Sequence, residues 1–218
     1  MNQTATPTAQ DWRARATALV INGQAFIDGR YVDAASGETF DDVTPIDGRV
    51  IARVASTDKA DVERAVAAAR RAFDSGVWSR QPPRERKRVL QCFAELILAH
   101  RDELALLETL DMGKPISDSL AVDIPATARC IAWYAEAVDK VYDEVAPTDR
   151  NSVVLIVREP LGVVGAVVPW NFPLLMASWK IGPALATGNS VVLKPAEQSP
   201  LTALRLGELA AEAGLPDG

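Results

Sequence analysis

One stretch of this sequence, from Val163 to Gln198, restricts the fold more than any other. It holds two short apolar runs, Val163–Val168 and Ser190–Leu193, on either side of an apolar segment of helical length, Leu174–Thr187. This order is typical of a strand, a helix and a second strand. Two parallel strands need such a crossover, because a tight turn joins only antiparallel neighbours. We therefore predict that the stretch begins an open, doubly wound parallel sheet of the α/β class.

Polar, turn-forming residues follow both predicted strands. Pro169-Trp170-Asn171-Phe172-Pro173 follows the first strand, and Lys194-Pro195-Ala196-Glu197-Gln198 follows the second. Open α/β sheets bind ligands beyond the carboxyl ends of their strands, so these residues are candidates for a binding site. The amide of Asn171 can donate to a developing oxyanion without titrating, or it can simply satisfy its own turn. Lys194 and Glu197 can bind ribose hydroxyls, or they can be ordinary surface charges.

The region before Val163 is predicted to contain two hairpins and a further strand. Asp28-Gly29, within Gln24–Val32, is typical of a tight two-residue turn. Asp47-Gly48 is predicted to join its flanking strands in the same way. A continuous β-branched run favours another strand within Asn151–Glu159.

Apolar residues at helical spacing predict several helices. Asp58 is the predicted N-cap of one that ends at Gly76, and Ser199 is the predicted N-cap of the last. A break is expected at Gly182-Pro183 inside the crossover helix, and a bend is expected at Pro125. The predicted helical ranges are about 11–19, 58–76, 82–112, 118–141 and 200–214.

Composition and charge restrict the function. The net charge of −6 and the isoelectric point near 4.9 argue against nucleic-acid binding, which needs a basic face. Cys92 and Cys130 give neither a disulfide framework nor a metal-binding spacing, and they suit a reducing cytoplasm. The uncharged segment 161–179 contains Pro169 and Pro173, unlike a membrane span, so we expect a soluble cytoplasmic protein. Because His100 is the single histidine, neither a zinc site nor a Ser-His-Asp triad is expected.

Taken together, the two turn motifs resemble the cofactor-side signature of the NAD(P)-dependent aldehyde dehydrogenase superfamily. The resemblance extends over about Phe26–Gly218 and includes Leu106–Pro115 and Ile156–Val163. It implies the N-terminal part of an aldehyde dehydrogenase-like fold of the α/β class, with an incomplete doubly wound parallel sheet, a β-hairpin arm and helices. Asp123-Ile124-Pro125 and Trp133–Tyr142 are similar to the γ-glutamyl-γ-aminobutyraldehyde dehydrogenases of putrescine breakdown.

The resemblance assigns roles to the turn residues. In the family, the residue at Asn171 helps bind the oxyanion that forms when a cysteine thiolate attacks the aldehyde substrate. The residues at Lys194 and Glu197 bind the adenosine ribose. Glu197 favours NAD over NADP as the cofactor, because a carboxylate repels a 2′-phosphate. The implied cofactor-binding residues are Val168, Pro169, Trp170, Asn171, Lys194, Ala196 and Glu197.

A cation and partner subunits are also implied. Resembling enzymes place a monovalent cation near the residue at Asp111, with the carbonyls of Val43 and Gln198 as partners. Alternatively, Asp111 is a plain aspartate at the C-terminus of a helix. The strand within Asn151–Glu159 is similar to the bridging segment through which full-length relatives form homodimers or homotetramers.

The resemblance places the catalytic nucleophile outside the two turn motifs. Aldehyde oxidation in this family needs a catalytic cysteine and a glutamate general base, and the resemblance assigns both to a portion that would follow Gly218. Cys92 and Cys130 lie on apolar faces of predicted helices, where we expect buried structural cysteines. We therefore expect the 218-residue chain to be inactive by itself and, with an incomplete sheet, prone to aggregation. The alternative is a non-catalytic module for dinucleotide binding or oligomerisation.

The expected organisation has four parts. Residues 1–20 form a flexible N-terminus and a short helix, and residues 21–150 form an N-terminal arm and the helical part of a cofactor domain. Residues 151–162 form the bridging strand. Residues 163–218 form the first strand–helix–strand–helix portion of the cofactor domain.

Overall fold

The computed structural model describes residues 7–218. Residues 1–6, part of the segment expected to be flexible, lie outside the described residues. The helices are α1 (Ala9–Ala18), α2 (Lys59–Ser75), α3 (Pro83–Ala99), α4 (Arg101–Met112), α5 (Ile116–Asp118), the π-helical turn η1 (Ser119–Asp123), α6 (Ile124–Ala137), α7 (Pro173–Ala186) and α8 (Leu201–Glu212). The strands are β1 (Ala25–Ile27), β2 (Arg30–Val32), β3 (Thr39–Val43), β4 (Val50–Ala55), β5 (Glu144–Ala146), β6 (Val154–Ile156), β7 (Val163–Val167) and β8 (Ser190–Lys194).

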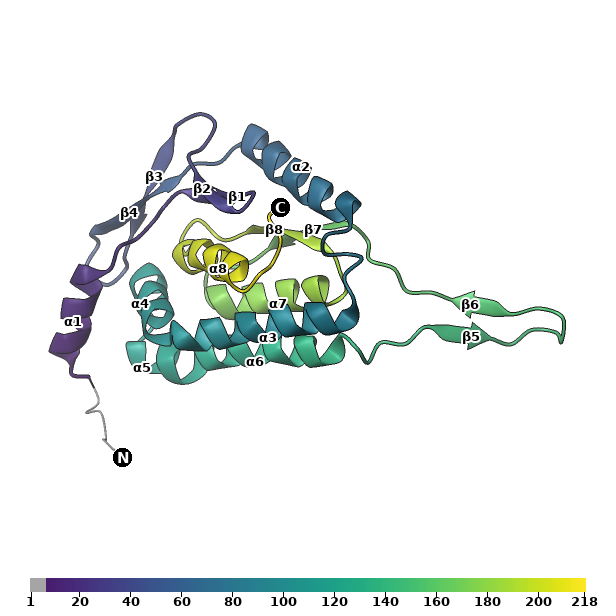
Figure 1. Cartoon of the computed structure of the whole chain (residues 1–218). Coiled ribbons are helices and arrows are strands. Elements are labelled where there is room, and N and C mark those ends of the chain that lie inside the picture. The colour runs from purple at the N-terminus through teal and green to yellow at the C-terminus, as the bar shows by residue number, and fades with distance from the viewer. Residues whose placement is uncertain (1–6) are drawn as a thin grey trace.

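The predicted parallel strand–helix–strand unit is confirmed. Strands β7 and β8 pair in parallel, in a register that runs from Val163 opposite Ser190 to Val167 opposite Lys194. Helix α7 makes the crossover and packs against both strands, while α2 contacts both strands as well. Figure 1 shows α2 on one side of this small sheet and α7 on the other. The two strands are therefore covered on both faces, as expected for an open α/β sheet.

Three helices form the main core. Helix α6 packs against both α3 and α7, and the three helices lie beneath the sheet in Figure 1. Their contact faces carry fully buried side chains, among them Phe93 of α3, Ile131 of α6 and Leu174 of α7. Burial of such side chains stabilises the fold by about 1.5–3 kcal/mol each. None of the helices in residues 7–218 is long and apolar enough to cross a membrane.

Helix α7 is continuous, so the break predicted at Gly182-Pro183 is wrong. The helix runs through Pro183, and Gly182 faces the ring of Tyr134 on α6. A Cβ atom at position 182 would lie 2.7 Å from Cδ2 of Tyr134. The glycine therefore permits a close approach of two helices, and the buried contact between α6 and α7 outweighs the cost of an internal proline.

The two N-terminal hairpins differ in their turns. Asp28 and Gly29 both have positive φ angles, 55° and 73°, as the predicted tight turn between β1 and β2 requires. The same prediction for Asp47-Gly48 is wrong, because only Gly48 has a positive φ and the loop between β3 and β4 spans residues 44–49. In that loop the backbone N–H of Thr44 donates to the carbonyl of Arg49 at 3.0 Å. A longer loop thus replaces the two-residue turn.

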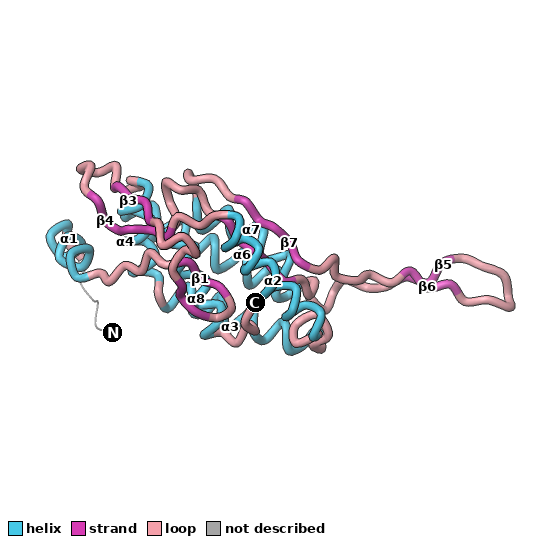
Figure 2. The backbone as a smooth tube through the Cα atoms, turned by 90° about the horizontal axis from the view of Figure 1, so that it is seen from above, coloured by secondary structure: helices cyan, strands magenta, loops and turns pink. Residues whose placement is uncertain are grey.

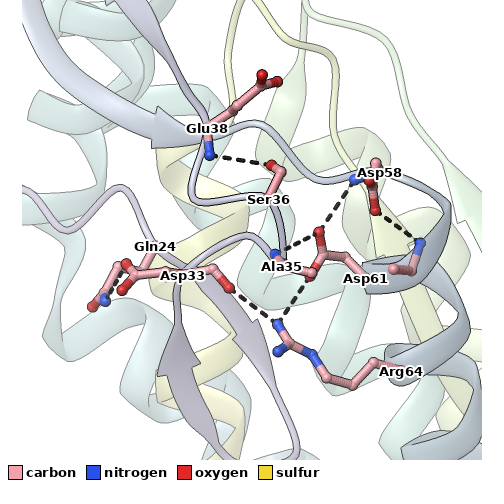
Figure 3. A network of polar contacts seen from close by, with 9 residues as sticks. Gln24, Asp33, Ala35, Ser36, Glu38, Asp58, Asp61 and Arg64 are labelled. Atoms are coloured by element: carbon pink, nitrogen blue, oxygen red, sulfur yellow. Dashed lines mark hydrogen bonds and ion pairs between the residues drawn. The ribbon is translucent and has the colours of Figure 1, made fainter.

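Helix α2 begins and ends at the predicted residues. Asp58 accepts a hydrogen bond from the N–H of Ala60 at 2.8 Å, and Gly76 ends the helix in the left-handed conformation. The buried Asp61 carboxylate accepts from the N–H groups of Ala35 and Asp58, and from Arg64 at 3.0 Å (Figure 3). This carboxylate therefore joins the start of α2 to the segment that follows the first hairpin.

An extended arm projects from the helical body (Figures 1 and 2). Its strands β5 and β6 are antiparallel, with Glu144 opposite Ile156 and Ala146 opposite Val154. The strand predicted within Asn151–Glu159 is thus shorter than expected, and its partner β5 was not predicted. Only three residues pair on each side of the arm.

The helices before the arm depart in detail from the predicted pattern. Helices α3 and α4 meet at His100, and the next helical region begins at Ile116 rather than near residue 118 and contains the π-helical turn just before Pro125. Cys92 and Cys130 are only partly buried, and the neighbouring Trp133 is 65% exposed. The expectation of buried cysteines was therefore wrong, since the apolar face around Cys130 is turned partly to solvent.

Candidate functional site

The turns that follow β7 and β8 lie side by side. The ladder continues one residue past the strands, where the N–H of Val168 donates to the carbonyl of Lys194 at 3.1 Å. The hydroxyl of Ser199 donates to the carbonyl of Trp170 at 3.2 Å and joins the two turns directly. All the candidate residues of the two motifs therefore lie at one edge of the sheet, where open α/β proteins place ligands.

Asn171 lies in an exposed turn before α7. The turn starts at Pro169, and Phe172 is the N-cap residue of the helix, with φ −143° and ψ 64°. The side-chain hydrogen bond at this turn joins Ser199 to the carbonyl of Trp170, and none within residues 7–218 involves the amide of Asn171. The alternative that this amide satisfies its own turn therefore finds no support, and its N–H groups remain available to a ligand.

Lys194 and Glu197 form an exposed ion pair at the end of β8. Hydrogen bonding to Lys194, followed by a backbone N–H, lowers the pKa of Glu197, so the carboxylate is charged at neutral pH. The carbonyl of Ala196 accepts from the N–H of Ser199 at 3.2 Å, which keeps the loop tightly turned. One donor and one acceptor therefore stand next to each other on a short turn and face solvent.

Asp111 lies in the last turn of α4 and also caps the start of helix α8. Its buried carboxylate accepts a hydrogen bond from the N–H of Leu201, the first residue of α8, at 2.9 Å. The predicted N-cap, Ser199, instead bonds to Trp170. A residue distant in the sequence therefore caps α8 in place of a local one, because Asp111 supplies an acceptor for the free N–H groups at the start of the helix.

A second buried carboxylate, Asp42, lies beside Asp111. The two groups are close enough for Asp42 to affect the pKa of Asp111, and Oδ2 of Asp42 and Oδ1 of Asp111 have no hydrogen-bond partner in the described residues. Burial, together with the charge of Asp42, raises the pKa of Asp111 to about 9. Sequence reasoning missed Asp42, although Phe40 and Asp42 share one face of β3 and Val43 is exposed after a β-bulge.

The remaining reactive side chains lie away from this edge. Cys92 is on α3 and Cys130 is on α6, two helices of the core layer. His100 forms a hydrogen bond through Nδ1 with Glu103 at 2.7 Å, and both side chains are partly exposed. Residues 7–218 contain no group of three or more His, Cys, Asp or Glu side chains arranged to hold a metal ion.

A parallel strand–helix–strand unit with polar turns at the carboxyl end of both strands is typical of open α/β proteins, which bind their ligands at that edge. The comparison with known families extends this description to most of the sequence. The model of the aldehyde dehydrogenase family matches residues 31–218, and the chain belongs to that family. The resemblance carried by the two turn motifs is thereby confirmed.

Individual relatives are similar over nearly the whole chain. The NADP/NAD-dependent aldehyde dehydrogenase PuuC of Escherichia coli is 56% identical over 207 residues, which are 95% of this chain and 42% of PuuC. The crystal structure of γ-glutamyl-γ-aminobutyraldehyde dehydrogenase from Burkholderia cenocepacia superposes with a TM-score of 0.94 at 62% identity, covering 95% of this chain and 42% of that one. An indole-3-acetaldehyde dehydrogenase crystallised with NAD⁺ gives a TM-score of 0.96 at 62% identity, covering 97% and 43%.

The fold is therefore that of part of an aldehyde dehydrogenase. The chain spans about two fifths of the length of the relatives that it matches. Its helices, its small sheets and its parallel strand pair all follow the arrangement of those structures.

Proposed function

We propose that this chain supplies the oxyanion donor and the adenosine-binding residues of an NAD(P)-dependent aldehyde dehydrogenase. The observation that carries the proposal is the meeting of two turns at one sheet edge, where the Trp170 carbonyl accepts from Ser199. One turn bears the free amide of Asn171, and the other bears the ion pair of Lys194 and Glu197. The aldehyde is oxidised to a carboxylate, and an aminoaldehyde such as γ-glutamyl-γ-aminobutyraldehyde is the substrate that we favour, in the breakdown of putrescine in the cytoplasm.

The chemistry of Lys194 and Glu197 fits a ribose. Both side chains are more than half exposed, so their pairing is worth little to the stability of the fold. A ribose presents two adjacent hydroxyls, which accept from an ammonium and donate to a carboxylate. The cofactor supplies the hydride acceptor when it is bound. We propose that the backbone of Val168, Pro169 and Trp170, with Ala196, lines the same dinucleotide.

Asn171 is the proposed donor to the substrate oxygen. Its amide is neutral and unoccupied, so it can stabilise negative charge that develops on the aldehyde oxygen without changing protonation state. We further propose that the isolated chain does not oxidise aldehydes, because Cys92 and Cys130 lie on helices of the core layer and not at this edge. A purified sample with NAD⁺ and γ-aminobutyraldehyde or propanal tests this. Turnover that disappears in Cys92→Ala or Cys130→Ala would contradict it.

The cofactor proposal is tested by calorimetric titration of the chain with NAD⁺ and NADP⁺. Glu197→Gln and Lys194→Met are each expected to weaken NAD⁺ binding by about tenfold, which corresponds to about 1.4 kcal/mol. Glu197→Gln should also reduce the preference for NAD⁺ over NADP⁺, because the repulsion of a 2′-phosphate is removed. Lys140→Met, at an exposed lysine that pairs with Asp139, is the matched control. Equal affinity of all four proteins would refute the proposal.

We also propose a monovalent cation at Asp111, with the carbonyls of Val43 and Gln198. The unpartnered oxygens of the buried Asp42 and Asp111 support this, because two adjacent carboxylates need a proton or a cation between them. Thermal unfolding in potassium chloride and in choline chloride at equal ionic strength tests it. Potassium should raise the melting temperature of the chain but not that of Asp111→Asn, and equal curves in both salts would count against the site.

The arm is the proposed contact with a second copy in a homodimer or homotetramer. Val145, Val153, Leu155 and Val157 are all more than half exposed on it, which is unusual for apolar side chains of a free surface. Light scattering after size exclusion measures the oligomeric state. Leu155→Glu should produce monomer, whereas Lys59→Glu, on the exposed start of α2, should leave the assembly intact. A monomeric unmodified chain would refute this proposal and favour a lone dinucleotide-binding module.

A further inference from the structure

A buried ammonium lies beneath the turn that carries Asn171. Nζ of Lys114 is 2.8 Å from Oδ2 of Asp123 and 3.4 Å from Oε1 of Glu108. The same nitrogen lies 3.9 Å from the centre of the Phe172 ring. Phe172 is the neighbour of Asn171 in the chain, while Lys114 is 58 positions away. We call the side chains of Lys114, Glu108, Asp123 and Phe172 the Lys114 cluster.

Two carboxylates from separate elements fix the ammonium. Glu108 lies on α4 and Asp123 ends the π-helical turn, and both are essentially inaccessible to solvent. The Lys114 side chain is only 12% exposed, in the segment between α4 and α5. A buried charge that loses its partner is strongly unfavourable, so the ammonium has little freedom to leave this position.

The charges of the cluster balance when one proton is held between the acids. Oε2 of Glu108 and Oδ1 of Asp123 have no hydrogen-bond partner within residues 7–218. Burial and the nearby charge of Asp123 raise the pKa of Glu108 to about 7. A protonated Glu108 can donate to Asp123, which leaves one carboxylate facing one ammonium. Asp111 is a further buried acid close enough to Glu108 for the charge of Glu108 to raise its pKa.

The face of the Phe172 ring lies against the ammonium of Lys114. Phe172 is 40% exposed, and its carbonyl accepts from the N–H of Met176 at 2.8 Å in the first turn of α7. An ammonium over the face of an aromatic ring attracts the ring electrostatically, and more strongly where water is excluded. The ammonium therefore favours this position of the ring, and Phe172 is joined to Asn171 by one peptide bond.

We propose that Lys114 is a positioning residue, which holds the Phe172 ring and thereby aims the amide of Asn171. The proposal rests on the proposed role of Asn171 as an oxyanion donor, but the geometry that it predicts exists in the chain without substrate or cofactor. The interaction differs from ordinary core packing, because it depends on the charge of Lys114 and not on the volume of its side chain.

The test follows the side-chain amide of Asn171 by NMR in the full chain labelled with ¹⁵N-asparagine. Asn171→Ala identifies the resonance pair. Lys114→Met keeps the length of the stem and removes the charge, so it should shift the Asn171 amide signals by more than a line width. Phe172→Leu should do the same, and the double variant should add nothing. Lys140→Met, at an exposed lysine, is the control that should leave the signals in place.

Folding is monitored in the same spectra by the amide of the buried Asn189. If Lys114→Met unfolds the chain, Lys114→Arg retains the charge and Glu108→Gln retains a neutral donor to Asp123. Both should leave the Asn171 signals near their original positions, and Glu108→Gln should remove any shift seen on titration through pH 7. Unmoved Asn171 signals in a folded Lys114→Met or Phe172→Leu chain would overturn the proposal. Absence of NAD⁺ binding would refute only the proposed function, because this readout involves no ligand.

Discussion

The carboxylate of Asp111 accepts a hydrogen bond from the backbone N–H of Leu201 at 2.9 Å, across 90 residues of sequence. One buried side chain thus joins the end of α4 to the start of α8, the helix that follows the Lys194 turn. Leu201 is itself buried and packs with Val54 and Leu107 in a second, smaller core. The position of the candidate site therefore depends on a contact between distant parts of the chain.

Replacing Asp111 by alanine and by asparagine should change the stability of the fold differently. Asp111→Ala removes the acceptor for the N–H of Leu201, so the free energy of unfolding should fall by about 1–3 kcal/mol. Asp111→Asn keeps an acceptor for Leu201 and supplies a donor to the carboxylate of Asp42. It should therefore equal or exceed the original chain in stability at pH 8 in choline buffer. Urea unfolding of the three proteins measures this, and a loss in Asp111→Asn as large as in Asp111→Ala would contradict it.

Stability should decrease between pH 6 and pH 9. The pKa of Asp111 is raised to about 9 and that of Glu108 to about 7, while both groups have pKa values near 4 in an unfolded chain. In this range the folded state holds more protons than the unfolded state, so the stabilisation present at low pH is lost as pH rises through 7 and then 9. Each proton contributes a slope of up to about 1.4 kcal/mol per pH unit.

Urea unfolding at several pH values measures this slope. The Asp111→Asn variant should have a flatter profile above pH 7, and Glu108→Gln should have a flatter profile below it. A free energy of unfolding that rises from pH 6 to pH 9 in the unmodified chain would show that these carboxyls are ionised in the fold at neutral pH.

Asn189 should be essential for joining β7, α7 and β8. Its Oδ1 accepts from the N–H of Gly162 at 2.9 Å, and its Nδ2 donates to the carbonyl of Ala184 at 3.2 Å and to Thr187 at 2.9 Å. Asn189→Ala leaves the buried N–H of Gly162 without its partner, so a loss of about 1–3 kcal/mol is expected in thermal or urea unfolding. Asn151→Ala, on the exposed loop of the arm, is the matched control and should change nothing measurable.

Gly182→Ala should destabilise the chain although alanine favours helices. The intrinsic gain is roughly 1 kcal/mol, but the added methyl group would lie within 2.7 Å of the Tyr134 ring. Overpacking of this kind costs about 1–3 kcal/mol, so a net loss is expected. Adding Tyr134→Leu should recover part of that loss, because the smaller side chain makes room. A Gly182→Ala chain that is more stable than the original would show that α6 and α7 separate easily.

Much of the local structure could be predicted because its causes are local. The caps of α2 at Asp58 and Gly76 use groups within a few residues of the helix ends, and the turn at Asp28-Gly29 needs only its own φ angles. The predictions were wrong where a residue distant in the sequence decided the local structure. Asp111 displaced Ser199 as the cap of α8, and packing against Tyr134 kept α7 continuous.

By itself, the sequence determined that two parallel strands with a helical crossover end in the Asn171 and Lys194 turns, because apolar periodicity and turn-forming residues act over short distances. Only the tertiary structure decided which charges are buried. Asp42 meets Asp111, and Lys114 meets Phe172, through contacts between elements that are far apart in the chain. Burial lowers the local dielectric, so these encounters set the pKa values and the positions of side chains that no local pattern specifies.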